Sequence, residues 1–557
     1  MTSIYSIFAV STISIGVLFF GVFLAHSGKL TYFVNYLIAM YFAYYLWLEG
    51  SGIFTRFEMS EINGIATYFA DTQEDSLYFR YFVFYSTIIL IIFFIGISDR
   101  FFRSKASLYE FPILILFLFL GGLFALSLHT FIDIFLGLEI VTLASYVLIT
   151  LERQNRFSTY AGIQYFILGS LPSAILLIAF GLFYLQGGSV ALQDLDILFN
   201  STVSLTEPVE SNGIIMLFNS IEGLSVDIKS STWYLFAYDN NYLDINSIIE
   251  SVNVENSLII IGILFLFFNF FFKLTAAPFH VWAPSVYGKA PIASVAFLSI
   301  YSKIRIFFLI YKLMNSFMYR FSFITFTSFI LIGLLTLIIG IIGAFSEKRI
   351  KPFFVYSSMG HVGFILVSIS LGTLDGTVAT FNYLFIYILS SFVMWFILLI
   401  MSRNTIKLSQ FSSLKNMNPR LAIFFAFLIF SRSGIPPFGG FFIKLDILAA
   451  VIESSHFLIA YFLFTCTVIS FFYYLRLIKI IYFDIPENSG TSVNRISFSN
   501  TYEAEYHIQN VYRLWIIAII MIILSFYIFM RQKPRFIINQ EMLSSLFLFL
   551  FLFLMSP

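Results

Sequence analysis

Long apolar runs recur along this chain and limit the folds open to it. A transmembrane helix needs about 20 consecutive apolar residues to cross the hydrocarbon core of a bilayer. Fourteen runs of suitable length lie near residues 4–26, 30–49, 81–98, 108–128, 131–150, 160–186, 257–278, 290–311, 321–345, 353–372, 377–401, 421–450, 457–482 and 513–530. Because the runs are continuous rather than alternating, they favour helices over a transmembrane barrel. We therefore expect an all-α polytopic membrane protein with about 14 transmembrane helices.

The composition argues against several classes of protein. Of the 557 residues 11% are charged, whereas a soluble domain has about 25% charged residues. The net charge of +1, without a basic stripe, argues against a nucleic-acid partner. The single cysteine, Cys466, cannot form an internal disulfide or hold an iron–sulfur cluster, and no nucleotide-binding loop or paired-histidine metal motif occurs. We expect no cofactor, metal site or redox centre in this chain.

Basic residues in the predicted loops indicate the orientation of the chain. The connections that follow odd-numbered runs, such as Ser346–Lys351 and Ser402–Arg420, are richer in lysine and arginine than those on the other side. The positive-inside rule places the richer side in the cytoplasm or the matrix, so the N-terminus is expected on the opposite side. Two long connections, 187–256 and 483–512, exceed ordinary loop lengths, and we expect them either to contact neighbouring proteins or to be solvated.

Charges also occur where a membrane span should be apolar. A charge at the centre of a bilayer costs at least about 3 kcal/mol, so such residues usually line water or meet a partner. The basic residues inside or at the edge of apolar runs are Lys273, Lys303, Arg305, Arg432, Lys444 and Arg476. Snorkelling toward the membrane surface is a sufficient explanation for Arg476 and an open alternative for the other two arginines, but it suits Lys273 and Lys444 poorly.

Helix-breaking residues stand beside two of these lysines. Proline lacks an amide hydrogen and clashes with the preceding turn, so a helix must break or kink there. The breaking residues are Pro278, after Lys273, and Gly434, Pro436 and Pro437, before Lys444. Backbone groups freed within a membrane need water or protein partners, so each break predicts a hydrated cavity beside its lysine. Interrupted helices in both halves of a chain are typical of inverted-repeat transporters.

Three further ionisable side chains are candidates for the same site. Glu139 lies deep in the run 131–150. Proximity of Glu139 to Lys273 would favour the charged forms of both, and separation would let the lysine release its proton, which is a possible relay switch. A polar clamp between two helices is the alternative. His280 and His361 lie near membrane depth and either pass protons or simply pack.

The motifs around these residues resemble a known family. Residues 272–287 read FKLTAAPFHVWAPSVY, residues 356–361 read YSSMGH, and GIPP at 434–437 precedes Lys444. This combination is similar to the antiporter-like membrane subunits of respiratory NADH:ubiquinone oxidoreductase (complex I). Val286 and Tyr287, and a lysine at position 444, favour the subunit-2 branch of that family.

The resemblance implies a fold and a domain plan. It implies fourteen core helices in which spans four to eight and nine to thirteen form two inverted five-helix repeats, with two broken helices. Residues 1–107 would be N-terminal transmembrane helices. Residues 108–311 would form the first repeat, with the acidic insertion 187–256, and 321–482 the second. Residues 483–557 would hold a polar loop, the last core helix and a C-terminal extension.

The resemblance also implies a proton-translocating function. Glu139 and Lys273 would form a charge-controlled gate, Lys303 a central proton carrier, and Lys444 the exit. FMN, iron–sulfur clusters and ubiquinone would bind to partner subunits, which carry electrons from NADH. The other partners would be membrane-arm subunits and lipids such as cardiolipin. A mitochondrial inner-membrane location, with the N-terminus in the intermembrane space, suits the 74 phenylalanines and 33 tyrosines, whose codons are AT-rich as in organelle genomes.

The chain departs from the family pattern at several positions. Gln164 stands where the family usually has a lysine, Ser285 where it has an aspartate, and Arg432 where it has an apolar residue. Glutamine cannot carry a proton as an ammonium does, so one relay station is in doubt. Gln164 leaves open a structural membrane-arm subunit with a decayed channel, and a subunit of an Mrp-type cation/proton antiporter, which would share the lysines and the broken helices, is a second alternative.

Overall fold

The computed structural model describes residues 110–127, 130–195, 254–316, 318–401 and 407–484, apart from residues 193, 418 and 437. All of them belong to one compact unit, Met1–Val493, and the second unit, Asn494–Pro557, lies outside the described ranges. Within these ranges the chain is helical, and extended pairing is limited to two isolated bridges, Thr130 with Ala191 and Arg349 with Lys407. The predicted all-α fold class is therefore confirmed for the described part.

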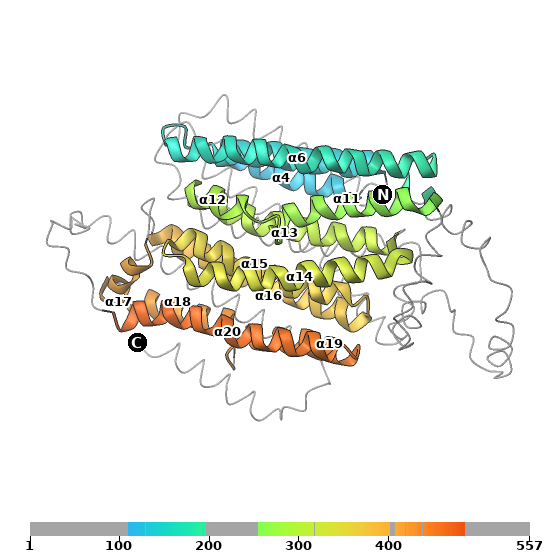
Figure 1. The fold of residues 1–557 in the computed structure, drawn as a ribbon. Coiled ribbons are helices and arrows are strands. Elements are labelled where there is room, and N and C mark those ends of the chain that lie inside the picture. Colours follow the sequence, from blue (N-terminus) through green and yellow to red (C-terminus); the bar gives the residue numbers. More distant parts are fainter. Residues whose placement is uncertain are drawn as a thin grey trace, which may run out of the picture. The chain divides into compact units, whose positions relative to one another are not determined.

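The helices run alongside one another for most of their lengths (Figure 1). They are α4 (Glu110–Ser127), α5 (Phe131–Ile149), α6 (Arg156–Gly187), α11 (Val254–Lys273), α12 (Trp282–Lys289), α13 (Ile292–Asn315), α14 (Ser322–Ser346), α15 (Ile350–Ser370), α16 (Leu374–Met401), α17 (Leu414–Met417), α18 (Pro419–Ser433), α19 (Gly439–Glu453) and α20 (Phe457–Tyr482), with 3₁₀ helices η4 (Met318–Phe321) and η5 (Leu408–Ser413). Among the described residues, seven helices are long and apolar enough to cross a membrane: α5, α6, α13, α14, α15, α16 and α20.

The ten apolar runs between residues 108 and 482 each coincide with helix. The run 421–450 is divided between α18 and α19, and the short helix α12 was not predicted from hydropathy. The runs near 4–26, 30–49, 81–98 and 513–530, and the breaking residue Pro437, lie outside the described residues.

Side-chain caps fix the starts of two neighbouring helices. Thr130 Oγ1 accepts the backbone N–H of Asp133 at 3.2 Å and donates to the Asp133 carboxylate at 2.5 Å, which satisfies a free amide in the first turn of α5. Asn155 accepts the amide of Phe157 at 3.1 Å at the start of α6. The other end of α6 is closed by Gly188 at a φ of +66°, a left-handed conformation that glycine adopts without steric cost.

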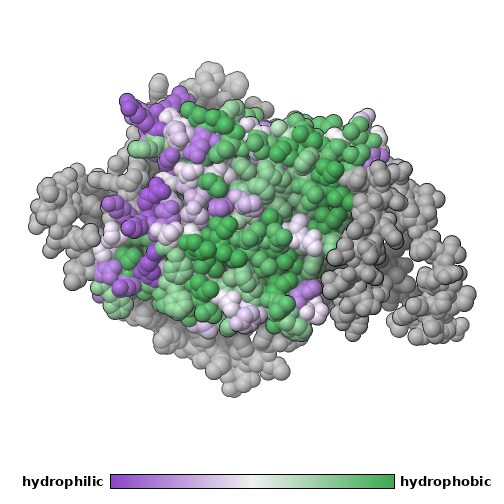
Figure 2. Space-filling model, viewed as in Figure 1, coloured by the Kyte–Doolittle hydropathy of each residue, from purple (hydrophilic) through white to green (hydrophobic). Residues whose placement is uncertain are grey.

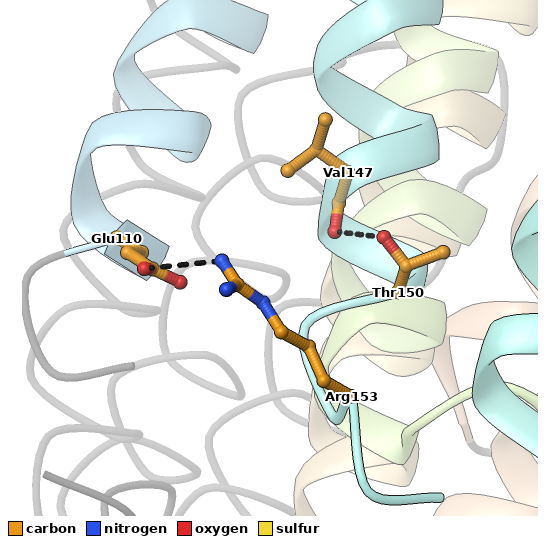
Figure 3. Close-up of polar contacts among 4 residues, drawn as sticks. All are labelled: Glu110, Val147, Thr150 and Arg153. Atoms are coloured by element: carbon orange, nitrogen blue, oxygen red, sulfur yellow. Dashed lines mark hydrogen bonds and ion pairs between the residues drawn. The ribbon is translucent and has the colours of Figure 1, made fainter. Parts of the chain in front are cut away.

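Loops that carry basic residues meet at one end of the bundle. The carbonyl of Lys348, between α14 and α15, accepts a backbone hydrogen bond from η5 at 3.0 Å. Lys289, at the end of α12, places its ammonium 4.2 Å from the centre of the Tyr160 ring near the start of α6. Arg153, in the α5–α6 loop, lies 3.4 Å from the Glu110 carboxylate at the start of α4 (Figure 3). Hydrophilic residues gather along the edge where α12 and α17 lie, beside a broad hydrophobic surface (Figure 2). These loops, predicted to share one side of the membrane, are therefore grouped in the structure.

Helices α13 and α15 are almost entirely buried, whereas only about a third of the residues in the apolar windows of α6 and α20 are buried. Lys303 and Arg305 belong to α13, and His361 belongs to α15. The two central helices thus carry ionisable side chains into the most enclosed part of the bundle.

Candidate functional site

The first predicted break lies between α11 and α12. Helix α11 ends at Lys273, and Thr275 has a φ of +60°. The carbonyl of Phe272, freed by the break, accepts the indole N–H of Trp282 at 3.2 Å and the amide of Thr275 at 3.1 Å. The backbone groups that the break releases are thus partly satisfied by the segment that follows, which includes the exposed Pro278.

Glu139, which is half-buried, and the buried Lys273 and Arg305 form a charged cluster on α5, α11 and α13. Each of the two cations lies within electrostatic range of the Glu139 carboxylate, and they act on one another. No direct ion pair within 4.0 Å joins Glu139 to Lys273 in the described part of the chain; Glu139 Oε2 instead accepts from the Thr142 hydroxyl at 3.2 Å. Lys273 Nζ, Glu139 Oε1, and Nε and Nη1 of Arg305 are buried without a protein hydrogen-bond partner. Residues of three helices therefore place more polar atoms in this cluster than have a hydrogen-bond partner in the protein.

Gln164 and Ser285, two of the departures from the family pattern, contact one another. Gln164 Nε2 on α6 donates to Ser285 Oγ on α12 at 3.0 Å, and the Ser285 hydroxyl donates to the carbonyl of Trp282 at 2.8 Å. The aromatic ring of Tyr165 stacks on Trp282 beside this contact, with ring centres 5.0 Å apart. A neutral hydrogen-bonded pair thus occupies both positions.

Lys303 lies at the centre of the bundle with 1% of its surface exposed. Its ammonium donates to Ser358 Oγ on α15 at 2.8 Å, to the Ser358 carbonyl at 3.4 Å and to the Tyr387 hydroxyl on α16 at 3.1 Å. Oxygen atoms from two helices therefore replace water around this ammonium.

His361 is held between two phenols. Its Nδ1 lies 2.7 Å from the Tyr383 hydroxyl on α16, and its Nε2 lies 3.3 Å from the Tyr474 hydroxyl on α20. Tyr474 continues to Ser357 Oγ at 3.0 Å. Both ring nitrogens are thus engaged, one as a donor and one as an acceptor in the neutral imidazole.

The second predicted break separates α18 from α19 and positions Lys444. Gly434 has a φ of +86°, and Ser433 is the last residue of α18. Lys444, from the first turns of α19, donates to the Ser433 carbonyl at 2.9 Å. A cation is favoured there because the carbonyls at a helix C-terminus carry partial negative charge. Helix α19 approaches α18 so closely that a side chain at Gly440 would collide with the Ser431 carbonyl.

The open snorkelling explanation is wrong for Arg305 and Arg432, because only 2% and 3% of their surfaces are exposed. Arg432 Nη1 contacts Met394 Sδ at 3.1 Å, and its guanidinium lies 5.9 Å from the centre of the Tyr387 ring. Arg476 instead donates to three carbonyls at the end of α14, at 2.7–3.1 Å. It acts as a helix cap at the basic end of the bundle.

The predicted residues divide into two groups. Glu139 and Lys273 meet in the first cluster, whereas Lys303, His361 and Lys444 lie together around α15, each within electrostatic range of Arg432. His280, half-buried between α11 and α12, faces the Tyr356 ring with ring centres 6.3 Å apart, and no described contact joins it to the lysines. The phenols of the second group were not predicted, because the sequence holds 33 tyrosines without a distinguishing motif.

Comparison with known proteins places the chain among membrane subunits. The family model described as "NADH:quinone oxidoreductase/Mrp antiporter, TM" matches residues 129–470. The NADH-ubiquinone oxidoreductase chain 2 of Marchantia polymorpha is 32% identical over 391 residues, which cover 70% of each chain.

Solved structures share the fold. A chain of respiratory complex I from Thermus thermophilus aligns with a TM-score of 0.61 at 20% identity, over 86% of this chain and 90% of that one. A chain of the Mrp complex from Dietzia sp. aligns with a TM-score of 0.62 at 17% identity, over 86% and 79% of the two chains.

Proposed function

The chain belongs to the NADH:quinone oxidoreductase/Mrp antiporter family, and we propose that, as an antiporter-like membrane subunit of complex I, it translocates protons through its buried ionisable residues. Electrons would pass from NADH to ubiquinone in partner subunits that hold FMN and iron–sulfur clusters. This chain would contribute neither a cofactor nor a redox centre to that transfer.

The observation that carries this proposal is the burial of Lys273, Lys303 and Lys444 within apolar helices. Burial of a charge is costly, and a residue retained against that cost at membrane depth usually serves ion or proton movement. Two of these lysines stand at helix breaks, and polar backbone within a membrane is tolerated where it is buried in protein or lines water. Buried polar atoms without protein partners around Glu139 and Arg305 require water, which would connect the groups.

In this proposal Glu139 and Lys273 form the gate. Approach of the carboxylate would hold the proton on the lysine, and its withdrawal would release the proton toward Lys303. From Lys303 the proton would pass the His361 region to Lys444 and leave the membrane. His280 would be a secondary group near the first break.

Position 164 would not hold a proton in this relay. Gln164 is not ionisable, and its hydrogen bond to Ser285 ties it to α12. Proton transfer on this side would therefore depend on Glu139 and Lys273.

We also propose the finer architecture and setting. The chain would have fourteen core helices in two inverted five-helix repeats, within the mitochondrial inner membrane. The basic end of the bundle would face the matrix, and the N-terminus the intermembrane space. Partners would be the other membrane-arm subunits and lipids, including cardiolipin.

Substitution of Lys273 or Lys444 by methionine tests the function. Methionine preserves much of the side-chain volume and removes the ionisable group. We expect NADH-driven proton uptake into sealed membrane vesicles, followed with a pH-sensitive dye, to fall sharply while the complex stays assembled on native gels. Replacement of the exposed Lys479 on α20 by methionine is the matched control.

The alternatives give different results. A structural subunit with a decayed channel would pump at the wild-type rate in both variants, which would refute the relay. An Mrp-type antiporter would exchange sodium ions for protons across the vesicle membrane without NADH.

A further inference from the structure

Tyr387 is a buried phenol that contacts the central lysine. It lies on α16 with 2% of its surface exposed, and its hydroxyl is 3.1 Å from Lys303 Nζ. The other hydroxyl at this ammonium, Ser358 Oγ, donates its own proton to the Val355 carbonyl at 2.7 Å and therefore only accepts from the lysine. Of the two hydroxyls that contact Lys303, Tyr387 is thus the one whose proton is not committed to a helix carbonyl.

The environment of Tyr387 is cationic and phenolic. Arg432 of α18 lies 5.9 Å from the centre of its ring, and the His361 ring of α15 has its centre 5.5 Å away. The remaining titratable groups that interact with it or with His361 are Tyr287 on α12, Tyr383 on α16, Lys444 on α19 and Tyr474 on α20. None of these groups, all within the described residues, is a carboxylate. Ser391, on the next turn of α16, is a neighbouring hydroxyl.

We propose that Tyr387 is a proton-transfer residue that carries the proton of Lys303 toward His361. This inference deepens the proposed function and rests on it. In the step, the Lys303 ammonium gives one proton to the phenol oxygen as the phenol O–H gives its own proton to an acceptor on the His361 side. The products are a neutral lysine amine, an intact phenol and a protonated acceptor, so one proton has moved across the phenol oxygen from Lys303 to the His361 side.

The geometry suits this step. The acceptor is a water on the His361 side of the phenol, because both imidazole nitrogens are already engaged by the Tyr383 and Tyr474 hydroxyls. The guanidinium of Arg432 lies 5.9 Å from the centre of the phenol ring. It therefore stabilises the negative charge that develops on the phenol oxygen during transfer, without taking the proton itself.

Y387F tests the inference because it removes one hydroxyl and keeps the ring. The matched control is Y311F, since the Tyr311 hydroxyl pairs with Thr380 and joins the same two helices, α13 and α16. We expect the rate of proton uptake per assembled complex to fall by about tenfold or more in Y387F. The control should pump near the wild-type rate. Equal rates in the two variants would overturn the inference.

A second variant applies if Y387F does not assemble. Y387H replaces the phenol by another group that accepts and releases protons, so it should pump with a pH optimum displaced from that of the wild type. Pumping at the wild-type optimum, or an assembled complex that does not pump, would overturn the inference.

Lys303→Met separates this inference from the proposed function. Loss of pumping in K303M together with wild-type pumping in Y387F would refute the role of Tyr387 alone. Wild-type pumping in K303M would refute the relay as a whole.

Discussion

The Gln164–Ser285 contact allows a quantitative test of how charge is distributed near the first break. We consider Q164K, S285D and the double variant, which together place an ammonium and a carboxylate where a neutral pair stands. Gln164 Nε2 and Ser285 Oγ are 3.0 Å apart, so the introduced charges can approach to within ion-pair distance. The positions lie on α6 and α12, which contact one another along the bundle.

The expected magnitudes follow from this geometry. A single unpaired charge at membrane depth costs about 3 kcal/mol. An ion pair about 4 Å apart contributes about 4 kcal/mol at an effective dielectric constant of about 20. Each single substitution should therefore destabilise the assembled complex by about 3 kcal/mol, and the double variant should recover most of that loss.

The assay is a double-mutant cycle on purified complex. The heat-inactivation midpoint and the amount of assembled complex on native gels would be compared for the four proteins. Gln154→Lys, in the exposed α5–α6 loop, controls for an added surface charge and should have little effect. Additive single effects, with a coupling below about 0.5 kcal/mol, would refute the reasoning that positions 164 and 285 act as a pair.

Three further predictions concern the helix ends. Gly434→Ala should destabilise the complex by about 1–2 kcal/mol and slow proton pumping. Alanine resists a φ of +86°, and its Cβ would lie 3.0 Å from Lys444 Cδ. The control Gly181→Ala, at an uncrowded position, should lower neither the melting temperature nor the pumping rate. Arg476→Met removes three hydrogen bonds to the end of α14. It should lower the heat-inactivation midpoint by the equivalent of about 1–3 kcal/mol. An unchanged midpoint would contradict the capping role of Arg476. Burial lowers the pKa of His456 below its ordinary value, so the unfolded state binds more protons and stability should fall as pH drops through about 6.5. This part of the pH dependence should disappear in His456→Gln when thermal stability is measured from pH 5 to 7.5.

The helices of the described part could be predicted well because their lengths are set by the bilayer. Runs such as 131–150 and 457–482 match α5 and α20 to within a residue. The breaks could be predicted because proline and glycine act locally on the backbone, whatever the surrounding fold. The short helix α12 escaped prediction because its residues are not apolar enough to form a run.

The ionisable residues of the site and their contacts could be predicted only in part. Lys273 and Lys444 attract notice because a lysine beside a helix break is unusual within an apolar sequence. Their surroundings were not predictable in the same way. The Ser433 carbonyl that accepts from Lys444 is released by the break, but its position depends on how α19 packs on α18.

The sequence by itself determined that the chain is a bundle of apolar helices, where two of them break, and which lysines lie within apolar runs. Those properties depend on residues close together in the chain. The tertiary structure alone decided that Gln164 meets Ser285 across 121 positions and that Lys303 meets Tyr387 across 84. The rotation of each helix about its own axis, and the neighbour it packs against, determine such contacts, because a shift of about 100° per residue moves a side chain from lipid to core.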